Sequence, residues 1–352
     1  MDKTALIAMS GGVDSSVAAI CMQQAGYSCR GVMLRLHDAG EEAAETAEAD
    51  AKAVADRLGI PFVVLDWRTA FAEQVIRPFI EAYEQGRTPN PCITCNRYMK
   101  FAGLHRYAAE NGMDMVVTGH YARIVYDADR GRYLLKKAKN LAKDQSYVLY
   151  NLTQEQLAHT AFPLGELPDK DTARNMAEGY GFGNAHKGDS QDICFVPDGK
   201  YADFIRRTTG RNYPEGDFVD ATGRVLGRHR GLIGYTVGQR KGLGLSLPAP
   251  LYVRCKCIED NTVLLTPESE LYTTHLVAED FNWISGDVPT APVVITARTR
   301  YSAKEAPATA TVLPDGRVEV AFEAPQRAVT EGQAVVLYDG DEVVGGGTIC
   351  KV

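Results

Sequence analysis

Hydrophobic and polar positions follow two different patterns along this chain. Over the first 120 residues or so, short apolar runs alternate with segments of helical periodicity. The runs Ala5–Met9, Arg30–Leu36 and Phe62–Asp66 are typical of strands buried on both faces of a parallel sheet. The segments between them, such as the alanine-rich Glu41–Leu58, predict helices. This alternation predicts an α/β fold with a doubly wound parallel sheet, in which ligands bind at the carboxyl ends of the strands.

The pattern changes in the second half of the chain. After about residue 210, short apolar strands such as Thr262–Thr266 and Val293–Arg298 are separated by turns rich in Gly, Asn and Asp. Short strands at this spacing are typical of small β-barrels. We therefore expect a catalytic α/β domain, a small central β-rich domain and a C-terminal β-barrel domain. The expected bounds are 1–205, 206–270 and 271–352.

Composition narrows the class of protein. Charged residues make up 24% of the 352 residues and hydrophobic ones 45%, which is ordinary for a globular protein. No apolar run approaches the length needed to span a membrane, so we expect a cytoplasmic protein with no membrane partner. In that compartment, the eight cysteines are expected to be buried, catalytic or metal-binding more often than paired in disulfides.

The distribution of charge is more informative than the net charge of −7. Three basic clusters interrupt an otherwise acidic chain. A solvated surface explains any one of them alone, whereas the three together fit a face that binds nucleic acid. The clusters are Arg130, Arg132, Lys136, Lys137, Lys139 and Lys143; Arg224, Arg228, His229, Arg230, Arg240 and Lys241; and Arg298, Arg300 and Lys304.

The loop Ser10–Ser16 lies between the first expected strand and the first expected helix. Its adjacent glycines allow the backbone to approach an anion, and free amides at a helix N-terminus then face it. Asp14 would repel phosphate, which suggests a divalent cation between the two. A Walker lysine and the spaced third glycine of a dinucleotide motif are both missing. An ordinary capped turn is the alternative, but the full seven-residue pattern favours phosphate binding.

Two further stretches contain cysteines. In Gly86–Asn96, Cys95 precedes an expected helix, whose dipole would lower the pKa of the thiol. Cys92 and Cys95 could also form a redox dithiol or half of a zinc site, but Cys255 and Cys257 are poorly spaced to complete one, so we assign no protein metal site. In Asp189–Phe195, Cys194 is equally consistent with a buried structural thiol and with a loop near a site.

Several motifs occur in a fixed order along the chain. Two more motifs lie between the second and third of the stretches above, and three follow the third. The first two are Thr118–Tyr121 and Lys143–Tyr147, and the other three are Gly238–Gly244, Ala297–Tyr301 and Ala324–Val329. Because it carries all of these motifs in this order, the chain resembles the tRNA-specific 2-thiouridylases. These enzymes belong to the ATP pyrophosphatases and convert the wobble uridine of tRNA anticodons to 2-thiouridine. The resemblance extends to the C-terminus. It implies an enzyme that adenylates the uridine 2-oxygen and then transfers sulfur from a cysteine persulfide.

The resemblance also implies roles for individual residues. Cys95 is the expected nucleophile and Cys194 the expected carrier of the persulfide. The expected ATP-binding residues are Met9, Ser10, Gly11, Gly12, Val13, Asp14, Ser15, Ser16, Met33 and Gly119. The residues expected to contact tRNA are Asn90, Pro91 and Cys92 at the target base, with His120, Lys143, Asp144, Gln145, Arg300, Tyr301 and Gln326.

ATP and Mg²⁺ are the implied cofactors, and the implied partners are tRNA and a sulfur donor, either a cysteine desulfurase or a relay protein. One resolving route leaves a Cys95–Cys194 disulfide. Some family members carry Asp at the position of Cys92, where it is a candidate acid/base group, and a cysteine could take that role only if its pKa falls toward neutrality. Alternatively, Cys92, Cys95 and Cys194 together could hold a [4Fe–4S] cluster that carries the sulfur. An ATP pyrophosphatase that acts on a small molecule and a non-catalytic RNA-binding protein remain as further alternatives.

Overall fold

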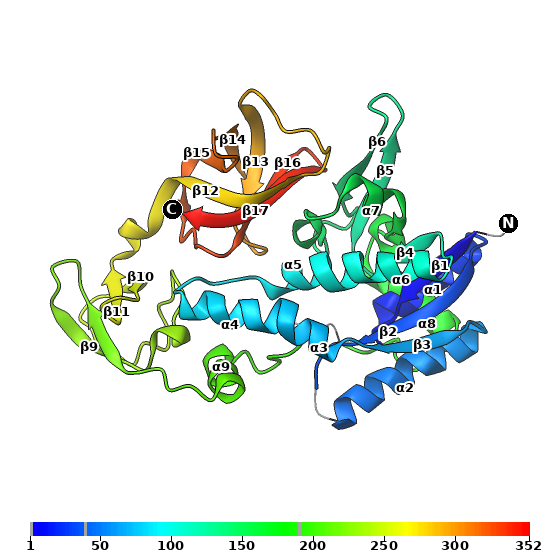
Figure 1. Cartoon of the computed structure of the whole chain (residues 1–352), viewed down its shortest axis with the longest axis horizontal. Coiled ribbons are helices and arrows are strands. Elements are labelled where there is room, and N and C mark those ends of the chain that lie inside the picture. Colours follow the sequence, from blue (N-terminus) through cyan, green and yellow to red (C-terminus); the bar gives the residue numbers. More distant parts are fainter. Residues whose placement is uncertain (1–2, 39–40, 189–191) are drawn as a thin grey trace.

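The computed structural model describes residues 3–38, 41–188 and 192–352, and for residues 41–44 it describes the backbone alone. Three regions follow one another along the chain, an α/β domain, a small β-rich domain and a barrel, and the barrel lies above the long helices of the first domain in Figure 1. The fold class expected from the sequence is confirmed. Asp189, Ser190 and Gln191, part of the third motif, lie outside the described residues.

The N-terminal sheet has five parallel strands in the order β3-β2-β1-β4-β7. Side chains of β1 alternate between two cores: Ile7 packs with helices on one face, and Leu6 packs with those on the other. Burial on both faces explains why the strands read as continuous apolar runs. The strands are β1 (Thr4–Ala8), β2 (Ser28–Arg35), β3 (Phe62–Asp66), β4 (Met115–Val117) and β7 (Thr160–Ala161).

Helices cover both faces of this sheet. The first face packs against α1 (Val13–Gln24), α2 (Glu41–Leu58) and α8 (Lys170–Gly179), and the second against α6 (Leu104–Glu110). Two long helical segments contain a π-helical stretch each, a feature that is frequent at functional sites. They run through α3 (Arg68–Phe71), residues 72–76 and α4 (Arg77–Glu84), and through α5 (Pro91–Cys95), residues 96–103 and α6.

The second of these segments begins earlier than the sequence indicated. Its first residue is Pro91, and the Asn90 side chain caps it by accepting a hydrogen bond from the backbone N–H of Cys92 at 3.1 Å. Proline suits the first helical position because its missing N–H is not needed there. Cys92 and Cys95 therefore lie inside the helix, whereas the sequence analysis placed Cys95 just before it.

The basic segment 130–143 mainly joins two domains. It belongs to the hairpin of β5 (Ala122–Asp127) and β6 (Arg132–Lys137), which pairs with β17 (Glu342–Lys351) through Lys136 and Glu342. Most of its cations are paired with acidic residues of the C-terminal region, so their charge is compensated within the protein. The pairs are Arg130–Glu342 at 2.8 Å, Arg132–Asp287 at 3.8 Å, Lys136–Asp341 at 3.1 Å and Lys137–Glu305 at 2.6 Å.

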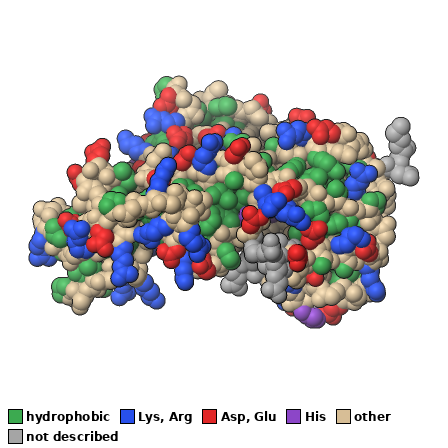
Figure 2. Space-filling model, turned by 60° about the horizontal axis from the view of Figure 1, so that its bottom comes forward, with side chains coloured by type: hydrophobic (Ala, Val, Ile, Leu, Met, Phe, Trp, Pro, Cys, Tyr) green, Lys and Arg blue, Asp and Glu red, His purple; other side chains and the backbone are tan. Residues whose placement is uncertain are grey.

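The central β-rich region presents a different basic cluster to solvent. Its four-stranded sheet has the order β10-β11-β8-β9 and follows α9 (Tyr201–Thr209). Arg224, Arg228, Arg230, Arg240 and Lys241 are exposed there, and only His229 of this cluster is buried. Figure 2 shows Lys and Arg side chains gathered on the left, where this region lies. The strands are β8 (Gly216–Val219), β9 (Val225–His229), β10 (Tyr252–Cys257) and β11 (Thr262–Thr266).

The C-terminal region is a closed antiparallel barrel. Strands pair in the order β12-β15-β14-β13-β16-β17, and β17 pairs back with β12 to close it. One hydrophobic cluster contains residues of both the α/β domain and the barrel, among them Tyr147 and Tyr338, so the two share a core. The strands not yet given are β12 (Tyr272–Trp283), β13 (Val293–Arg298), β14 (Ala306–Val312), β15 (Val318–Arg327) and β16 (Ala334–Asp339).

Candidate functional site

A cleft of about 720 Å³ opens at the carboxyl ends of β1 and β4. This is the edge at which a parallel α/β sheet binds ligands. The cleft also receives a side chain from the barrel, so it lies between domains that are distant in sequence. Its polar and glycine lining residues are Ser10, Gly12, Asp14, Ser15, Lys100, Thr118, Gly119, His120, Tyr121, Lys143, Gln145, Lys170, Lys187, Gly188 and Tyr301.

The loop after β1 has the geometry of an anion site. Gly11 adopts a φ of 74°, and a Cβ there would lie 2.4 Å from the carbonyl oxygen of Ala47, so only glycine fits. A Cβ at Gly119 would lie 2.9 Å from the backbone N of Ser15. α1 begins at Val13 with Gly12 as its N-cap, and no side chain caps it. The capped-turn alternative is therefore wrong, and free amides of the first helical turn are available to an anion.

Asp14 carries a salt bridge that the sequence did not reveal. The ammonium of Lys170, whose side chain is 8% exposed, lies 2.6 and 2.7 Å from the two carboxylate oxygens, and the hydroxyl of Tyr121 donates to Asp14 Oδ1 at 2.7 Å. Lys170 is the first residue of α8, and Asp169 caps that helix by accepting from Thr172 N–H at 2.7 Å. An ammonium thus compensates the charge of Asp14 in the folded chain, and the divalent cation that the sequence suggests stays a prediction.

Asn184 ties the phosphate loop to the segment that leads to Cys194. Its amide Nδ2 donates to the carbonyl of Gly11 and to Ser16 Oγ, both at 3.1 Å. Within the loop, Ser15 Oγ accepts from Ser10 N–H at 3.1 Å and donates to the carbonyl of Gly12 at 3.0 Å. Lone asparagines and lysines have no sequence signature, so neither Asn184 nor Lys170 could be singled out from the sequence.

The other expected nucleotide residues occupy different places. Val13 lines the cleft beside Met9. Ser16 is buried behind the loop, where its hydroxyl donates to the carbonyl of Gly12 at 3.0 Å. Met33 packs against the α1 face of the sheet, and its neighbours Val32 and Leu34 line the cleft.

His120 lines the same cleft as the phosphate loop. Its Nδ1 is 2.7 Å from Thr118 Oγ1. Burial and, secondarily, the nearby ammonium of Lys100 lower its pKa well below the ordinary value, which leaves the imidazole neutral at pH 7.

The three expected site cysteines come together near the cleft. The thiols of Cys95 and Cys92 interact electrostatically with that of Cys194, and the ammonium of Lys100 acts on all three. Lys100 also lines the cleft. It stands eight and five residues after Cys92 and Cys95 in one continuous helical segment, and it links the thiols to the nucleotide region.

An aromatic cluster brings the Cys194 loop to Cys95. Phe195, next to Cys194, packs edge-on against Phe71 and Phe79, with ring centroids 5.7 and 5.3 Å away. Cys95 is a member of the same buried cluster. The apolar neighbours of Cys194, which alone suggested a structural thiol, therefore hold the loop in place and leave Cys194 itself exposed.

Burial controls the acidity of these thiols. It raises the pKa of Cys95, and the partly opposing effect of Lys100 is smaller. Cys194 keeps contact with solvent, but the protein around it removes enough water to raise its pKa to about 12. The lowered pKa expected for Cys95 from a helix dipole is thus wrong for this structure, because desolvation of the thiolate dominates.

The residues expected to contact tRNA divide into two groups. Lys143, Gln145, His120 and Tyr301 line the cleft. Gln326 lies on β15, away from the cleft lining, and its amide donates to the carbonyl of Ala324 at 2.8 Å.

The remaining residues of that group divide by exposure. Arg300 and Cys92 are exposed, and Pro91 and Asp144 are buried. The carboxamide of Asn90 is engaged as the helix cap described above.

The described residues 3–38, 41–188 and 192–352 contain no group of three His, Cys, Asp or Glu side chains placed to hold a metal ion. All eight cysteines lie in this part of the chain and are free thiols, so the expected Cys95–Cys194 disulfide is not formed here. No described helix is long and apolar enough to cross a membrane.

Fold and cleft define the class of the protein: a nucleotide-binding α/β domain followed by two β domains. Family models match the chain in the same order. Residues 3–198 match the tRNA methyl transferase HUP domain, residues 202–267 the tRNA methyl transferase PRC-barrel domain, and residues 273–349 the aminomethyltransferase beta-barrel domain.

The chain belongs to the tRNA-specific 2-thiouridylase family, as its motifs indicated, and is an enzyme of that family that uses ATP. It is 48% identical to the tRNA-specific 2-thiouridylase MnmA of Acetivibrio thermocellus, with 99% of each chain covered. The MnmA of Clostridioides difficile is 46% identical over 100% of this chain and 99% of its own.

Among solved structures, the U34-tRNA thiolase NcsA from Methanococcus maripaludis with its [4Fe-4S] cluster has a TM-score of 0.37 and 17% identity. It covers 59% of this chain and 67% of its own, a likeness too low to bear on this chain's chemistry.

Proposed function

We propose that this enzyme uses ATP to convert the wobble uridine of tRNA anticodons to 2-thiouridine, with Cys194 carrying the sulfur as a persulfide. The observation that carries the proposal is that Lys100, which lines the cleft of the phosphate loop, acts electrostatically on both the Cys95 and the Cys194 thiol. Activation of a carbonyl by ATP and its replacement by sulfur require these two sets of groups to reach the same base.

The first step is adenylation of the uridine 2-oxygen. That oxygen attacks the α-phosphorus of ATP, and the bond to the β-phosphate oxygen breaks to release pyrophosphate. The free amides at the N-terminus of α1 and the backbone at Gly11, Gly12 and Gly119 would hold the phosphates. Lys170 compensates the charge of Asp14, so this carboxylate does not repel the phosphates at full strength.

Mg²⁺ enters the proposal only as the ion that accompanies ATP phosphates. Asp14 is already engaged by an ammonium and a hydroxyl, which does not fit a metal held there by the protein alone, so we derive no step from such a metal.

The second step replaces oxygen with sulfur. The terminal sulfur of the Cys194 persulfide attacks C2 of the adenylated base, and AMP leaves with the oxygen. The Cys95 thiolate then attacks Cys194 Sγ, the bond between the two persulfide sulfurs breaks, and its electron pair stays on the base sulfur as 2-thiouridine. A Cys95–Cys194 disulfide remains and needs an external thiol reductant. Lys100 favours the thiolate forms that these attacks require.

The proposal includes the partners and the domain roles. Residues 1–205 carry the chemistry, while residues 206–270 and 271–352 bind tRNA. The exposed basic cluster of the central region supports that assignment, because clustered cations bind phosphates without sequence preference. A cysteine desulfurase or a relay protein delivers sulfur to the exposed Cys194. The site of action is the cytoplasm, where such a tRNA substrate occurs.

The test is a reconstituted reaction containing the protein, ATP, Mg²⁺, a persulfide donor and unmodified tRNA transcript. We expect thiolated tRNA and AMP in equal amounts. Cys194→Ser should abolish thiolation and leave tRNA affinity within twofold of the wild type, because the side chain is exposed and close in size to serine. Full thiolation by Cys194→Ser would overturn the persulfide role.

The same reaction separates the alternatives. AMP formation without tRNA would indicate a synthetase that acts on a small molecule, and no AMP under any condition would indicate a binding protein. Anaerobically purified protein is expected to thiolate without iron or acid-labile sulfide. A requirement for both would favour a cluster on Cys92, Cys95 and Cys194.

A further inference from the structure

The C-terminal barrel contributes directly to the nucleotide cleft. Tyr301, on the loop between β13 and β14, lines the cleft together with the phosphate loop, Lys143 and Gln145. A loop of this kind has several conformations unless tertiary contacts select one. The contacts that hold it against the α/β domain therefore decide whether Tyr301 reaches the cleft.

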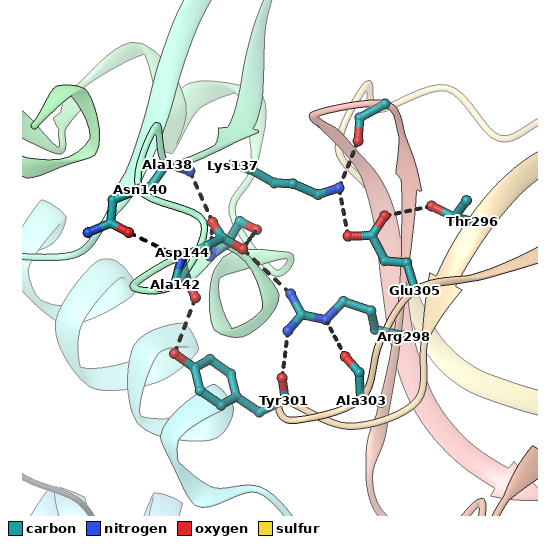
Figure 3. Close-up of polar contacts among 12 residues, drawn as sticks. Lys137, Ala138, Asn140, Ala142, Asp144, Thr296, Arg298, Tyr301, Ala303 and Glu305 are labelled. Carbon is teal, nitrogen blue, oxygen red and sulfur yellow. Dashed lines mark hydrogen bonds and ion pairs between the residues drawn. The ribbon is translucent and has the colours of Figure 1, made fainter. Parts of the chain in front are cut away.

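Asp144 is the buried centre of these contacts. Its side chain is 3% exposed. Oδ1 accepts hydrogen bonds from the backbone N–H of Ala138 at 3.0 Å and of Ser146 at 3.2 Å, and Oδ2 accepts from the Ser146 hydroxyl at 2.8 Å (Figure 3). These bonds fix the turn that carries Lys143 and Gln145.

Arg298 of the barrel contacts both domains. Its Nη1 lies 3.5 Å from Asp144 Oδ2, its Nη2 donates to the carbonyl of Tyr301 at 2.6 Å, and its Nε donates to the carbonyl of Ala303 at 3.1 Å. The guanidinium thus holds both the carboxylate of one domain and the backbone of the other domain's loop, as Figure 3 shows. The rigid fork of arginine suits this use.

Tyr301 closes the arrangement. Its hydroxyl donates to the backbone carbonyl of Asp144 at 3.2 Å, and its ring packs edge-on to Tyr147, with centroids 6.0 Å apart. The carboxylate of Asp144 is buried behind these groups. It is therefore placed to organise the surface and not to touch a bound RNA.

We propose that Asp144 and Arg298 are positioning residues that join the 138–146 turn and the 299–303 loop into one tRNA-binding surface at the nucleotide cleft. The inference rests on the proposed function for the identity of the RNA. The role expected for Asp144 thereby changes from a tRNA contact to one half of the Asp144–Arg298 ion pair, called the brace below, which holds together two segments that make such contacts. The inference also assigns a role to Arg298.

A second ion pair provides a matched control. Lys137 and Glu305 join the same hairpin and barrel at 2.6 Å, and Glu305 also accepts from the Thr296 hydroxyl at 2.8 Å. In Figure 3 this pair lies beside the brace. Besides each other, these two side chains contact the carbonyl of Gly340, the ring of Tyr338 and the hydroxyl of Thr296, and none of these contacts is to the backbone of residues 299–303. Removing it weakens the same domain junction without releasing the Tyr301 loop.

The experiment compares Arg298→Met with Glu305→Gln in the full-length protein, using unmodified tRNA transcript. For Arg298→Met we expect the Kd for tRNA and the KM for tRNA to rise at least tenfold, with the KM for ATP changed less than threefold. Glu305→Gln should change each constant less than twofold. Amide hydrogen exchange should accelerate in residues 299–303 of Arg298→Met only. Arg298→Lys keeps the positive charge but loses the planar guanidinium, so its Kd and KM for tRNA should lie between those of the wild type and Arg298→Met.

Thermal unfolding is measured for every variant, and Asp144→Asn gives a second way to break the brace if Arg298→Met does not fold. Wild-type tRNA affinity in a folded Arg298→Met or Asp144→Asn would overturn the proposal. So would an equal loss of affinity in Glu305→Gln, because the effect would then belong to the domain junction in general. If wild-type protein binds tRNA without thiolating it, the proposed function fails and the binding comparison still tests the brace.

Discussion

At the scale of single residues, desolvation decides the state of the reactive groups. Cys95 sits in an apolar cluster, and its pKa is raised in spite of the ammonium of Lys100 nearby. Asp14 and Lys170 compensate each other in a partly buried pair. On a surface the Cys95 thiol would not pay this desolvation cost, so its chemistry depends on what surrounds it and not on residue type alone.

The raised thiol pKa values predict a pH profile for alkylation. At pH 7, Cys95 and Cys194 are neutral thiols, so iodoacetamide should modify Cys194 at least tenfold more slowly, and Cys95 more slowly, than it modifies the thiol of an unfolded peptide. The rate should keep rising above about pH 10, where the rate for a peptide thiol has levelled off. Mass spectrometry of the two tryptic peptides gives the rates.

Guanidine-unfolded protein is the matched reference for that measurement, because it carries the same thiols without burial. Modification of folded Cys194 at the unfolded rate at pH 7 would contradict the prediction. Faster reaction after loading with a persulfide donor would not, since the persulfide is a different group.

At the scale of elements, the loop after β1 depends on backbone space as well as on glycine flexibility. Gly11 has a positive φ and also packs against the backbone of α2 at Ala47. The helix that follows then begins with uncapped amides. Together these features produce an anion site without any cationic side chain in the loop itself.

Gly11→Ala should therefore strongly weaken ATP binding. A Cβ 2.4 Å from the Ala47 carbonyl oxygen forces the loop to move, in addition to the strain of a positive φ, which alone costs ~1 kcal/mol. We expect at least a hundredfold loss of ATP affinity by calorimetry.

Gly26→Ala is the control for the backbone strain alone. Gly26 has a φ of 82°, and no atom lies within 4 Å of the added Cβ. This variant should lose a little thermal stability and bind ATP normally. Equal ATP affinity in Gly11→Ala and Gly26→Ala would show that the contact with α2 does not matter.

At the scale of the whole molecule, the α/β domain and the barrel share one hydrophobic core. Tyr147 and Tyr150 pack with Val336 and Tyr338 of β16 and with Val343 of β17. The ion pairs of the β5–β6 hairpin with the C-terminal region lie at the same junction. We therefore expect these two regions to unfold together.

Gly346→Ala tests this coupling. The added Cβ would lie 2.7 Å from Tyr150 Cγ and 2.8 Å from the carbonyl oxygen of Val335, so it overpacks the junction. Overpacking typically costs ~1–3 kcal/mol. One calorimetric transition should shift to lower temperature as a unit.

Gly179→Ala is the control for that shift. Gly179 ends α8, and nothing lies within 4 Å of an added Cβ, so this variant should be at least as stable as the wild type. If Gly346→Ala splits the transition and leaves the α/β domain at its wild-type temperature, the two regions do not share a cooperative core.

Local patterns predicted most of the fold. The bounds of α2, β3 and β13 agree with their predicted ranges, because helical periodicity and short apolar runs are strong local signals. The two strands that close the barrel, β12 and β17, were not predicted. β17 contains Gly345, Gly346 and Gly347, which weaken a strand signal, and their use becomes clear only where Tyr150 and Phe281 pack directly on them.

The sequence by itself determined the α/β class, the phosphate loop and the family, because motifs and periodicity are local in the chain. Only the tertiary structure decided which charges meet. It paired Asp14 with Lys170 across 156 positions and turned the basic segment 130–143 toward the acids of the barrel. It also buried Asp144 as a brace. Ion pairing and desolvation depend on distance in space, and separation along the chain does not encode that distance.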